Sequence, residues 1–145
     1  MKIYLAATIG KPKGLYRTNA IKAKSILESL GHVVLAPWET KIPGAWEMSN
    51  IEWGKRVFDE DIKNIEAADC VVVLSYGRKS TAGANWEAGY AYGRGKKVLV
   101  VEMFGLKIMS LMVSNGANAV INGFEELKKY DFNDWPKKMT GTEQK

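Results

Sequence analysis

The stretch that decides the fold is the apolar run Asp69-Cys70-Val71-Val72-Val73-Leu74, which is followed by a second apolar run at residues 96–101. Short continuous apolar runs are typical of strands that are buried on both faces of a parallel sheet. The segment between them, STAGANWEAGYA at 80–91, carries one carboxylate, Glu87, among small and aromatic residues. It predicts a loop that turns into a helix at the carboxyl edge of the sheet, where open α/β sheets bind ligands.

Outward from this unit, strands alternate with helices along the chain. The second apolar run gives a strand at 98–102, and three further strands are predicted at 3–8, 33–36 and 119–121, with helices at 15–30, 50–67, 108–113 and 124–130. The alternation predicts an α/β fold with a flavodoxin-like, Rossmann-like, doubly wound sheet of five parallel strands in the order 2-1-3-4-5. We expect one domain over residues 1–136 and a polar tail over 137–145.

Composition narrows the classes of partner. The chain has 145 residues, a net charge of +5, one cysteine and one histidine. These counts exclude an internal disulfide and disfavour a zinc site, and we expect a cytoplasmic protein with no metal and no cofactor. Apolar runs are too short for a membrane helix, and the basic residues are scattered, which disfavours nucleic-acid polymers and favours a small anionic ligand.

The loop after the first strand, Thr8-Ile9-Gly10-Lys11, is a candidate ligand loop. Its glycine and free N–H groups precede a helix, an arrangement that suits an anion such as phosphate. It matches neither the dinucleotide fingerprint nor the P-loop. An ordinary polar connection remains the alternative.

Glu87 is the candidate nucleophile. Trp86 and Tyr90 flank it, and Gly83 and Gly89 leave room for a ligand to approach the backbone. The alternative is a glutamate that the helix dipole stabilises.

Asp61 is the second candidate, because it lies on or beside the apolar stripe of the helix at 50–67. A carboxylate beside an apolar face needs a partner or a function, and a structural hydrogen-bond acceptor is the alternative. We expect Asn50 to cap this helix and Trp53 to belong to the core.

Three pieces together resemble the nucleoside 2-deoxyribosyltransferase superfamily: Tyr4 in the first strand, Asp61-Ile62-x-x-Ile65-x-x-Ala68-Asp69, and the segment 83–91. The resemblance covers nearly the whole chain. It implies cleavage of the N-glycosidic bond of 2'-deoxynucleosides or their 5'-monophosphates. It gives Glu87 the role of nucleophile, Asp61 that of acid and base, and Tyr4 that of holding the glutamate. It also implies a homodimer or larger homo-oligomer with shared sites.

Two branches of the superfamily differ around this motif. Transferases of the superfamily usually carry an aspartate six positions before the nucleophile, where this chain has Thr81 after Ser80. The branch that hydrolyses 5'-monophosphates holds phosphate with hydroxyls, which fall here on Thr8, on Thr81 or Ser80, and on Ser110 of a partner subunit. A helix-surface hydroxyl is the alternative for Ser110.

The first loop departs from that branch, because Gly10 stands where the hydrolases have an arginine, with Lys11 next to it. Lysine supplies a point charge without a bidentate grip. Asn118, in the stretch 115–118, is a candidate to reach substrate across a dimer. Trp38 or Trp46, in a connection long enough to be a substrate loop, either stacks on the base or packs on the protein.

The resulting prediction is a hydrolase of 2'-deoxynucleoside 5'-monophosphates. A transferase that exchanges bases between deoxynucleosides and a nucleotide-binding sensor that does not turn over remain alternatives, because fold alone does not decide activity. A flavodoxin-like electron carrier is disfavoured, since the first loop lacks a Ser/Thr-rich phosphate cradle.

Overall fold

Five parallel strands form one sheet in the order β2-β1-β3-β4-β5. The computed structural model describes residues 1–77, 79 and 81–135, so that Ser80 and the tail from 137 lie outside the described residues. The strands are β1 (Lys2–Ala6), β2 (Val33–Leu35), β3 (Cys70–Ser75), β4 (Lys97–Glu102) and β5 (Ala119–Asn122). This confirms the predicted fold class and strand order.

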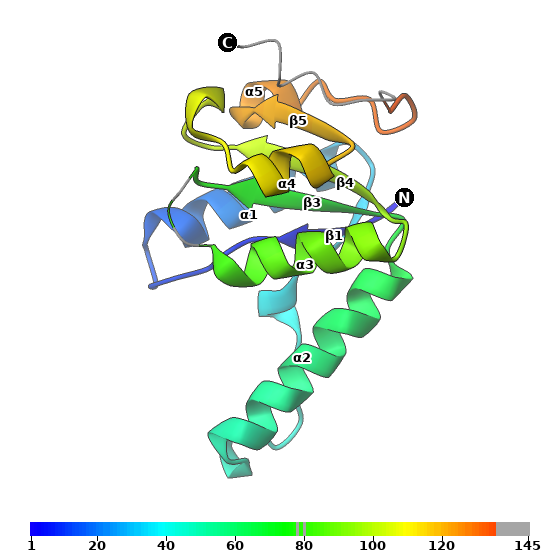
Figure 1. Cartoon of the computed structure of the whole chain (residues 1–145). Coiled ribbons are helices and arrows are strands. Elements are labelled where there is room, and N and C mark those ends of the chain that lie inside the picture. The colour runs from blue at the N-terminus through cyan, green and yellow to red at the C-terminus, as the bar shows by residue number, and fades with distance from the viewer. Residues whose placement is uncertain (78, 80, 136–145) are drawn as a thin grey trace.

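Helices cover both faces of the sheet (Figure 1). One face packs against α1 (Leu15–Ser29) and α5 (Gly123–Leu127), and the other against α2 (Asn50–Ala67), α3 (Ala82–Gly93) and α4 (Leu111–Gly116). Three short 3-10 helices lie in connections: η1 (Pro37–Glu39), η2 (Ala45–Glu47) and η3 (Leu106–Ile108). No helix in the part of the chain that the structure describes is long and apolar enough to cross a membrane.

The central strand β3 explains the two-sided core. All six of its residues are buried, and successive side chains point to opposite faces. Val72 and Leu74 join the core under α1, whereas Val71 and Val73 join the core under α3. A strand buried on both faces has to be apolar throughout, which is why this run decides the fold.

The N-terminus of α2 is fixed by a capping box. The Ser49 hydroxyl accepts a hydrogen bond from the Glu52 backbone N–H at 3.2 Å, and the Glu52 carboxylate accepts one from the Ser49 N–H at 3.2 Å. The expectation that Asn50 caps this helix is therefore wrong by one residue. Ser49 wins because a glutamate three residues later completes the reciprocal pair.

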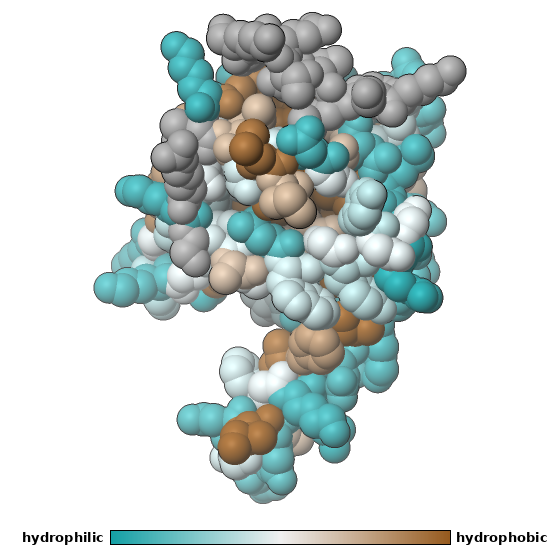
Figure 2. Space-filling model, viewed as in Figure 1, coloured by the Kyte–Doolittle hydropathy of each residue, from teal (hydrophilic) through white to brown (hydrophobic). Residues whose placement is uncertain are grey.

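The helix α2 projects from the body of the molecule (Figure 1). Ile65 is its one fully buried residue. The expectation that Trp53 belongs to the core is wrong, since its side chain is 47% exposed, and Phe58 is 49% exposed. Figure 2 shows hydrophobic side chains on this projecting segment, interspersed with hydrophilic ones. The apolar stripe of α2 thus extends beyond what this chain alone covers.

Candidate active site

Side chains from three elements meet between the sheet and the α2–α3 pair: Tyr4 of β1, Asp61 of α2 and Glu87 of α3. Tyr4 is completely buried in the middle of β1. Burial, the charge of Glu87 and hydrogen bonding to it, and the charge of Asp61 all raise the pKa of the Tyr4 hydroxyl well above its usual range. The structure therefore brings together the three residues that the resemblance singles out.

Both carboxyl groups hold their protons more tightly than exposed ones. Burial raises the pKa of Glu87 to about 7; the hydroxyl of Tyr4 opposes this rise, and the charge of Asp61 adds to it. Burial and the neighbouring Glu60 raise the pKa of Asp61 to about 6. Two interacting carboxyl groups of this kind titrate as a pair near neutral pH, which is the range that acid–base catalysis requires.

One atom of each residue is buried and forms no hydrogen bond of standard geometry within the described residues: Tyr4 Oη, Asp61 Oδ1 and Glu87 Oε2. An unsatisfied buried polar atom costs about 1–3 kcal/mol. Three such atoms lie in this one cluster, and each such group calls for an explanation. A polar substrate that hydrogen-bonds to them supplies one.

The composition of α3 places Glu87 against β1. Ala84, Ala88 and Ala91 are buried, and their small side chains let the helix lie close to the sheet. Gly83 leaves the space beside the carboxylate open, since a Cβ added there would stand 3.9 Å from Glu87 Oε1. Glu87 is the sixth residue of α3, beyond the first turn, so the helix dipole does not account for its position.

The first loop has a conformation that requires glycine at one position. Gly10 has φ +60, and a Cβ there would stand 3.3 Å from Tyr16 Cδ2. An arginine at position 10 is therefore disfavoured by both backbone and space. Thr8 and Ile9 are half-buried, whereas Lys11 is exposed and free to reach an anion from solvent.

Thr81 and Ser110 line a common depression of about 670 Å³ with Lys79 and Asn85. Thr81 is 3% exposed, and its Oγ1 donates to Asn85 Oδ1 at 3.4 Å. The Ser110 hydroxyl accepts from the Val113 N–H at 3.5 Å and caps α4. The structure thus brings these two predicted residues together, beside the N-terminus of α3.

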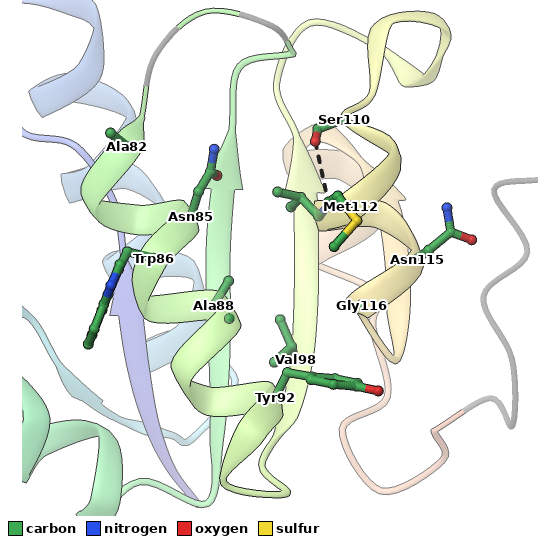
Figure 3. Close-up of a pocket in the computed structure, with 12 residues that line it drawn as sticks. Ala82, Asn85, Trp86, Ala88, Tyr92, Val98, Ser110, Met112, Asn115 and Gly116 are labelled. Carbon is green, nitrogen blue, oxygen red and sulfur yellow. Dashed lines mark hydrogen bonds between the residues drawn. The ribbon is translucent and has the colours of Figure 1, made fainter.

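A groove of about 690 Å³ runs between α3 and α4 (Figure 3). Asn85, Trp86 and Tyr92 line one wall, and Ser110 and Met112 the other. Glu87 does not line it. In a single subunit, Ser110 therefore opens onto the far side of α3 from the carboxylate pair.

The structure does not bring two further predicted residues to the cluster within one subunit. Asn118 lies at the amino edge of the sheet, where its Oδ1 accepts from the Val98 N–H at 2.8 Å. Trp38, in η1, packs against the core on the α1 face. Trp46, in η2, is 87% exposed.

Sequence reasoning missed the environment of Glu102, a completely buried glutamate at the carboxyl end of β4. Burial raises the pKa of its carboxyl group, while Ser75 and the backbone of Gly77 oppose the rise. The feature of the sequence that could have indicated it is the single acidic residue at the end of an otherwise apolar run. Among the described residues, no cluster of His, Cys, Asp and Glu has the arrangement of a metal site.

The chain belongs to the nucleoside 2-deoxyribosyltransferase family, whose model matches residues 3–125. The match confirms the resemblance read from Tyr4, the Asp61 motif and the Glu87 segment.

Individual relatives fit this assignment. A 2-deoxyribosyltransferase from the psychrotolerant bacterium Bacillus psychrosaccharolyticus is 30% identical, with a TM-score of 0.82 over 92% of this chain and 94% of that one. A nucleoside deoxyribosyltransferase of Lactobacillus johnsonii is 33% identical over 85 residues, 57% of this chain and 56% of the relative, so the match spans about half of that relative. A CMP N-glycosidase from Clostridium botulinum shares the fold at 17% identity, with a TM-score of 0.60 over 90% of this chain and 100% of that one.

Proposed function

We propose that this protein cleaves the N-glycosidic bond of 2'-deoxynucleoside 5'-monophosphates, with Glu87 as nucleophile. The observation that carries the proposal is the buried cluster of Tyr4, Asp61 and Glu87, in which each residue has an unsatisfied polar atom. Cleavage of a deoxyribosyl C1'–N bond passes through an oxocarbenium-like state, and an adjacent carboxylate stabilises and traps such a state.

The chemistry divides into two steps. In the first step, a Glu87 carboxylate oxygen bonds to C1' while the C1'–N bond breaks. The electron pair of the broken bond goes to the base, which takes a proton from Asp61. In the second, Asp61 takes a proton from water, the water oxygen bonds to C1', and the Glu87–C1' bond breaks to release the sugar. The raised pKa values of both carboxyl groups support this sharing of one proton.

The hydroxyl of Tyr4 has a distinct part in this scheme. It opposes the rise in the pKa of Glu87. By favouring the ionised form of Glu87, it brings the pKa of Glu87 closer to that of Asp61. The pKa of Glu87, about 7, still exceeds that of Asp61, about 6, so the first step requires that bound substrate move the shared proton from Glu87 to Asp61.

Hydroxyls and amines near the site support a 5'-phosphate as the second recognition element. Thr81 and Lys79 line one depression, and Thr8 and Lys11 stand in the first loop, whereas Ser110 opens onto the far side of α3 and would have to come from a partner subunit. The chain has a threonine at 81, where an aspartate would repel a phosphate. Because Gly10 disfavours an arginine, lysine charges would hold the anion here.

A base-exchanging transferase is the second candidate. It is favoured by the 30% identity to a 2-deoxyribosyltransferase over nearly the whole chain. In that reaction a second base, instead of water, attacks C1' in the second step. Ser80 is a further candidate contact for substrate.

The surface supports a shared-site homo-oligomer as part of the proposal. Exposed apolar side chains lie on α2 and its approach and on α3 and α4: Trp46, Ile51, Trp53, Phe58, Trp86, Tyr92, Leu111 and Met112. A surface this apolar favours association. A second copy would bring Ser110 and Asn118 of the partner within reach of the substrate.

A chromatographic assay for free base tests these assignments. The protein is incubated with each deoxynucleoside and each deoxynucleoside 5'-monophosphate, with and without a second base. Free base from monophosphates alone is the expected result. Exchanged nucleosides would identify the transferase instead, and binding without release would identify a sensor.

A further inference from the structure

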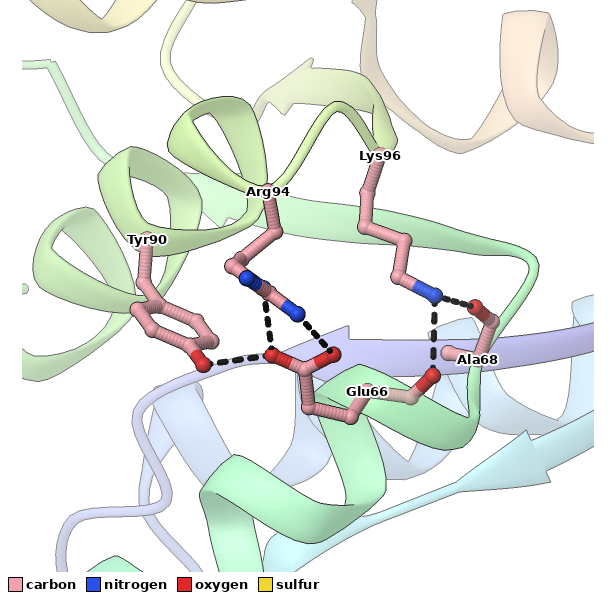
Figure 4. Close-up of polar contacts among 5 residues, drawn as sticks. All are labelled: Glu66, Ala68, Tyr90, Arg94 and Lys96. Carbon is pink, nitrogen blue, oxygen red and sulfur yellow. Dashed lines mark hydrogen bonds and ion pairs between the residues drawn. The ribbon is translucent and has the colours of Figure 1, made fainter.

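The helices that carry the two carboxylates are joined by polar contacts outside the site (Figure 4). Glu66 of α2 accepts a hydrogen bond from the Tyr90 hydroxyl at 2.5 Å. Arg94 donates to both oxygens of the same carboxylate, from Nε at 2.7 Å and from Nη2 at 3.2 Å. One side chain of α2 is thus held at three points, by Tyr90 of α3 and by Arg94, the residue that follows this helix.

The side chain of Lys96 binds backbone carbonyl groups at the same end of α2. Its Nζ donates to the carbonyl oxygens of Glu66 and Ala68, each at 2.8 Å. The last carbonyls of a helix have no partners within the helix and carry partial negative charge, so an ammonium group there is stabilising.

An aromatic contact joins the two helices on the other side of Asp61. Phe58 of α2 meets Trp86 of α3 edge to face, with ring centroids 5.3 Å apart. Trp86 in turn stacks on Tyr90 at 5.7 Å, and the two rings are inclined by 5°. The contacts of Phe58 and Glu66 therefore bracket Asp61 on α2, while Trp86 and Tyr90 bracket Glu87 on α3.

We propose that Glu66 is a positioning residue, which through Tyr90 and Arg94 sets the separation of Asp61 from Glu87. The need for such a residue follows from the projection of α2, whose one fully buried residue is Ile65. Within one subunit, a helix with so little buried surface depends for its angle to α3 on its few polar contacts and on the Phe58–Trp86 contact. The inference rests on the proposed function, because it assigns Asp61 and Glu87 to one reaction.

The contacts of Glu66 suit positioning better than stability. The side chains of Arg94 and Glu66 are 56% and 34% exposed, and ion pairs this exposed contribute little to the free energy of unfolding. Catalysis is more demanding, since a displacement of about 1 Å in a reacting group can cost about a hundredfold in rate. Loss of Glu66 should therefore be visible in kcat before it is visible in the thermal midpoint.

The first experiment compares Glu66→Ala and Glu66→Gln with Glu125→Ala, which removes an exposed ion pair of the same 2.7 Å length between Glu125 of α5 and Lys128, the residue that follows this helix. For Glu66→Ala we expect kcat to fall about tenfold or more, with KM within about threefold and the thermal midpoint close to that of Glu125→Ala. Glu66→Gln keeps an acceptor for Tyr90 and should recover part of kcat. The Glu66→Ala/Arg94→Ala double variant should lose no more than the worse single variant, because both act through one contact.

Two results would overturn the inference. One is a wild-type kcat in Glu66→Ala; the other is a loss of activity that follows a matching loss of folded protein. If the wild type releases no base from any substrate, the proposed function fails. The positioning role of Glu66 is then tested separately, by following the NMR signal of the Asp61 carboxyl carbon as the pH is changed. The substitution Glu66→Ala leaves the titratable groups around Asp61, which are Tyr4, Glu60 and Glu87, chemically unchanged. A lower pH midpoint of the Asp61 titration in this variant would therefore report that α2 has moved away from the site. An unchanged midpoint would refute positioning.

Discussion

Asp61 and Glu87 each stand six residues before the last residue of their helix, since α2 ends at Ala67 and α3 at Gly93. Both helices lead into neighbouring strands, β3 and β4, at the amino edge of the sheet. Six residues of helix span about 9 Å, so the two carboxylates lie at similar distances from that edge. Tyr4 is mid-strand in β1, which pairs with β3. The site thus lies over the sheet between two helices.

Replacement of Glu87 by glutamine tests the nucleophile directly. The amide keeps the size of the side chain but does not trap C1', so turnover should fall by roughly a thousandfold or more. The measurement is release of free base, with Glu125→Gln as a control for the loss of one surface carboxylate. Turnover within tenfold of the wild type would refute the covalent mechanism.

The same variant should be more stable than the wild type at high pH. The pKa of Glu87 is raised to about 7 from an ordinary 4.5, so its favourable contribution to stability is complete below about pH 4.5 and is lost as the pH rises through 7. Glutamine carries no charge at any pH and avoids this loss. At pH 8 we expect Glu87→Gln to exceed the wild type by on the order of 2 kcal/mol, allowing for partial exposure of the site.

Urea unfolding at pH 4 and pH 8 measures this difference. At pH 4 the advantage should vanish, because Glu87 is protonated in both the folded and the unfolded wild-type protein. An advantage of equal size at both pH values would mean that glutamine packs better and that no buried charge is involved.

The sequence predicted the sheet because β3 and β4 each carry at least four consecutive apolar residues, and it predicted Glu87 because one carboxylate stood among small residues. Prediction from the sequence failed where one pattern of residues fits two different structures. The stripe of Trp53 and Phe58 has the spacing of a core helix, yet α2 projects and leaves both residues half-exposed. Glu66 showed no signal at all, because its partners on α3 are more than twenty residues away and lie beside it only after folding.

Replacement of Asp61 by asparagine should lower kcat by an amount that depends on the base that leaves. An acid contributes about a hundredfold to ten-thousandfold where the departing base needs a proton. In a deoxynucleoside 5'-monophosphate whose base is already cationic, such as that of 7-methylguanine, the base departs without one. We expect a large fall in kcat for ordinary bases and a small one for the cationic base. Equal losses for both would show that Asp61 only holds the fold or the substrate.

Replacement of Tyr4 by phenylalanine should move the pH dependence of kcat. The Tyr4 hydroxyl lowers the pKa of Glu87, so its removal raises that pKa, and the acidic limb of the profile moves to higher pH. At pH 7 we expect a loss of about tenfold, because a hydrogen bond to a charged group contributes roughly 1.5–3 kcal/mol. Loss of the completely buried hydroxyl also removes the cost of keeping it from water, so the thermal midpoint should change little. A profile that shifts to lower pH would contradict the role of Tyr4.

The capping box of α2 offers a test at the far end of the helix from Glu66. Ser49→Ala removes a side-chain acceptor from the Glu52 N–H and should cost about 1 kcal/mol of the free energy of unfolding. Asn50→Ala is the matched control, because Asn50 is already inside the helix and makes no cap. Urea titration of both variants makes the comparison, and kcat should stay near wild type in each, since the contacts of Phe58 and Glu66 on either side of Asp61 lie well beyond the first turn of α2. A fall in kcat in Ser49→Ala alone would show that the N-terminal half of α2 also sets the position of Asp61.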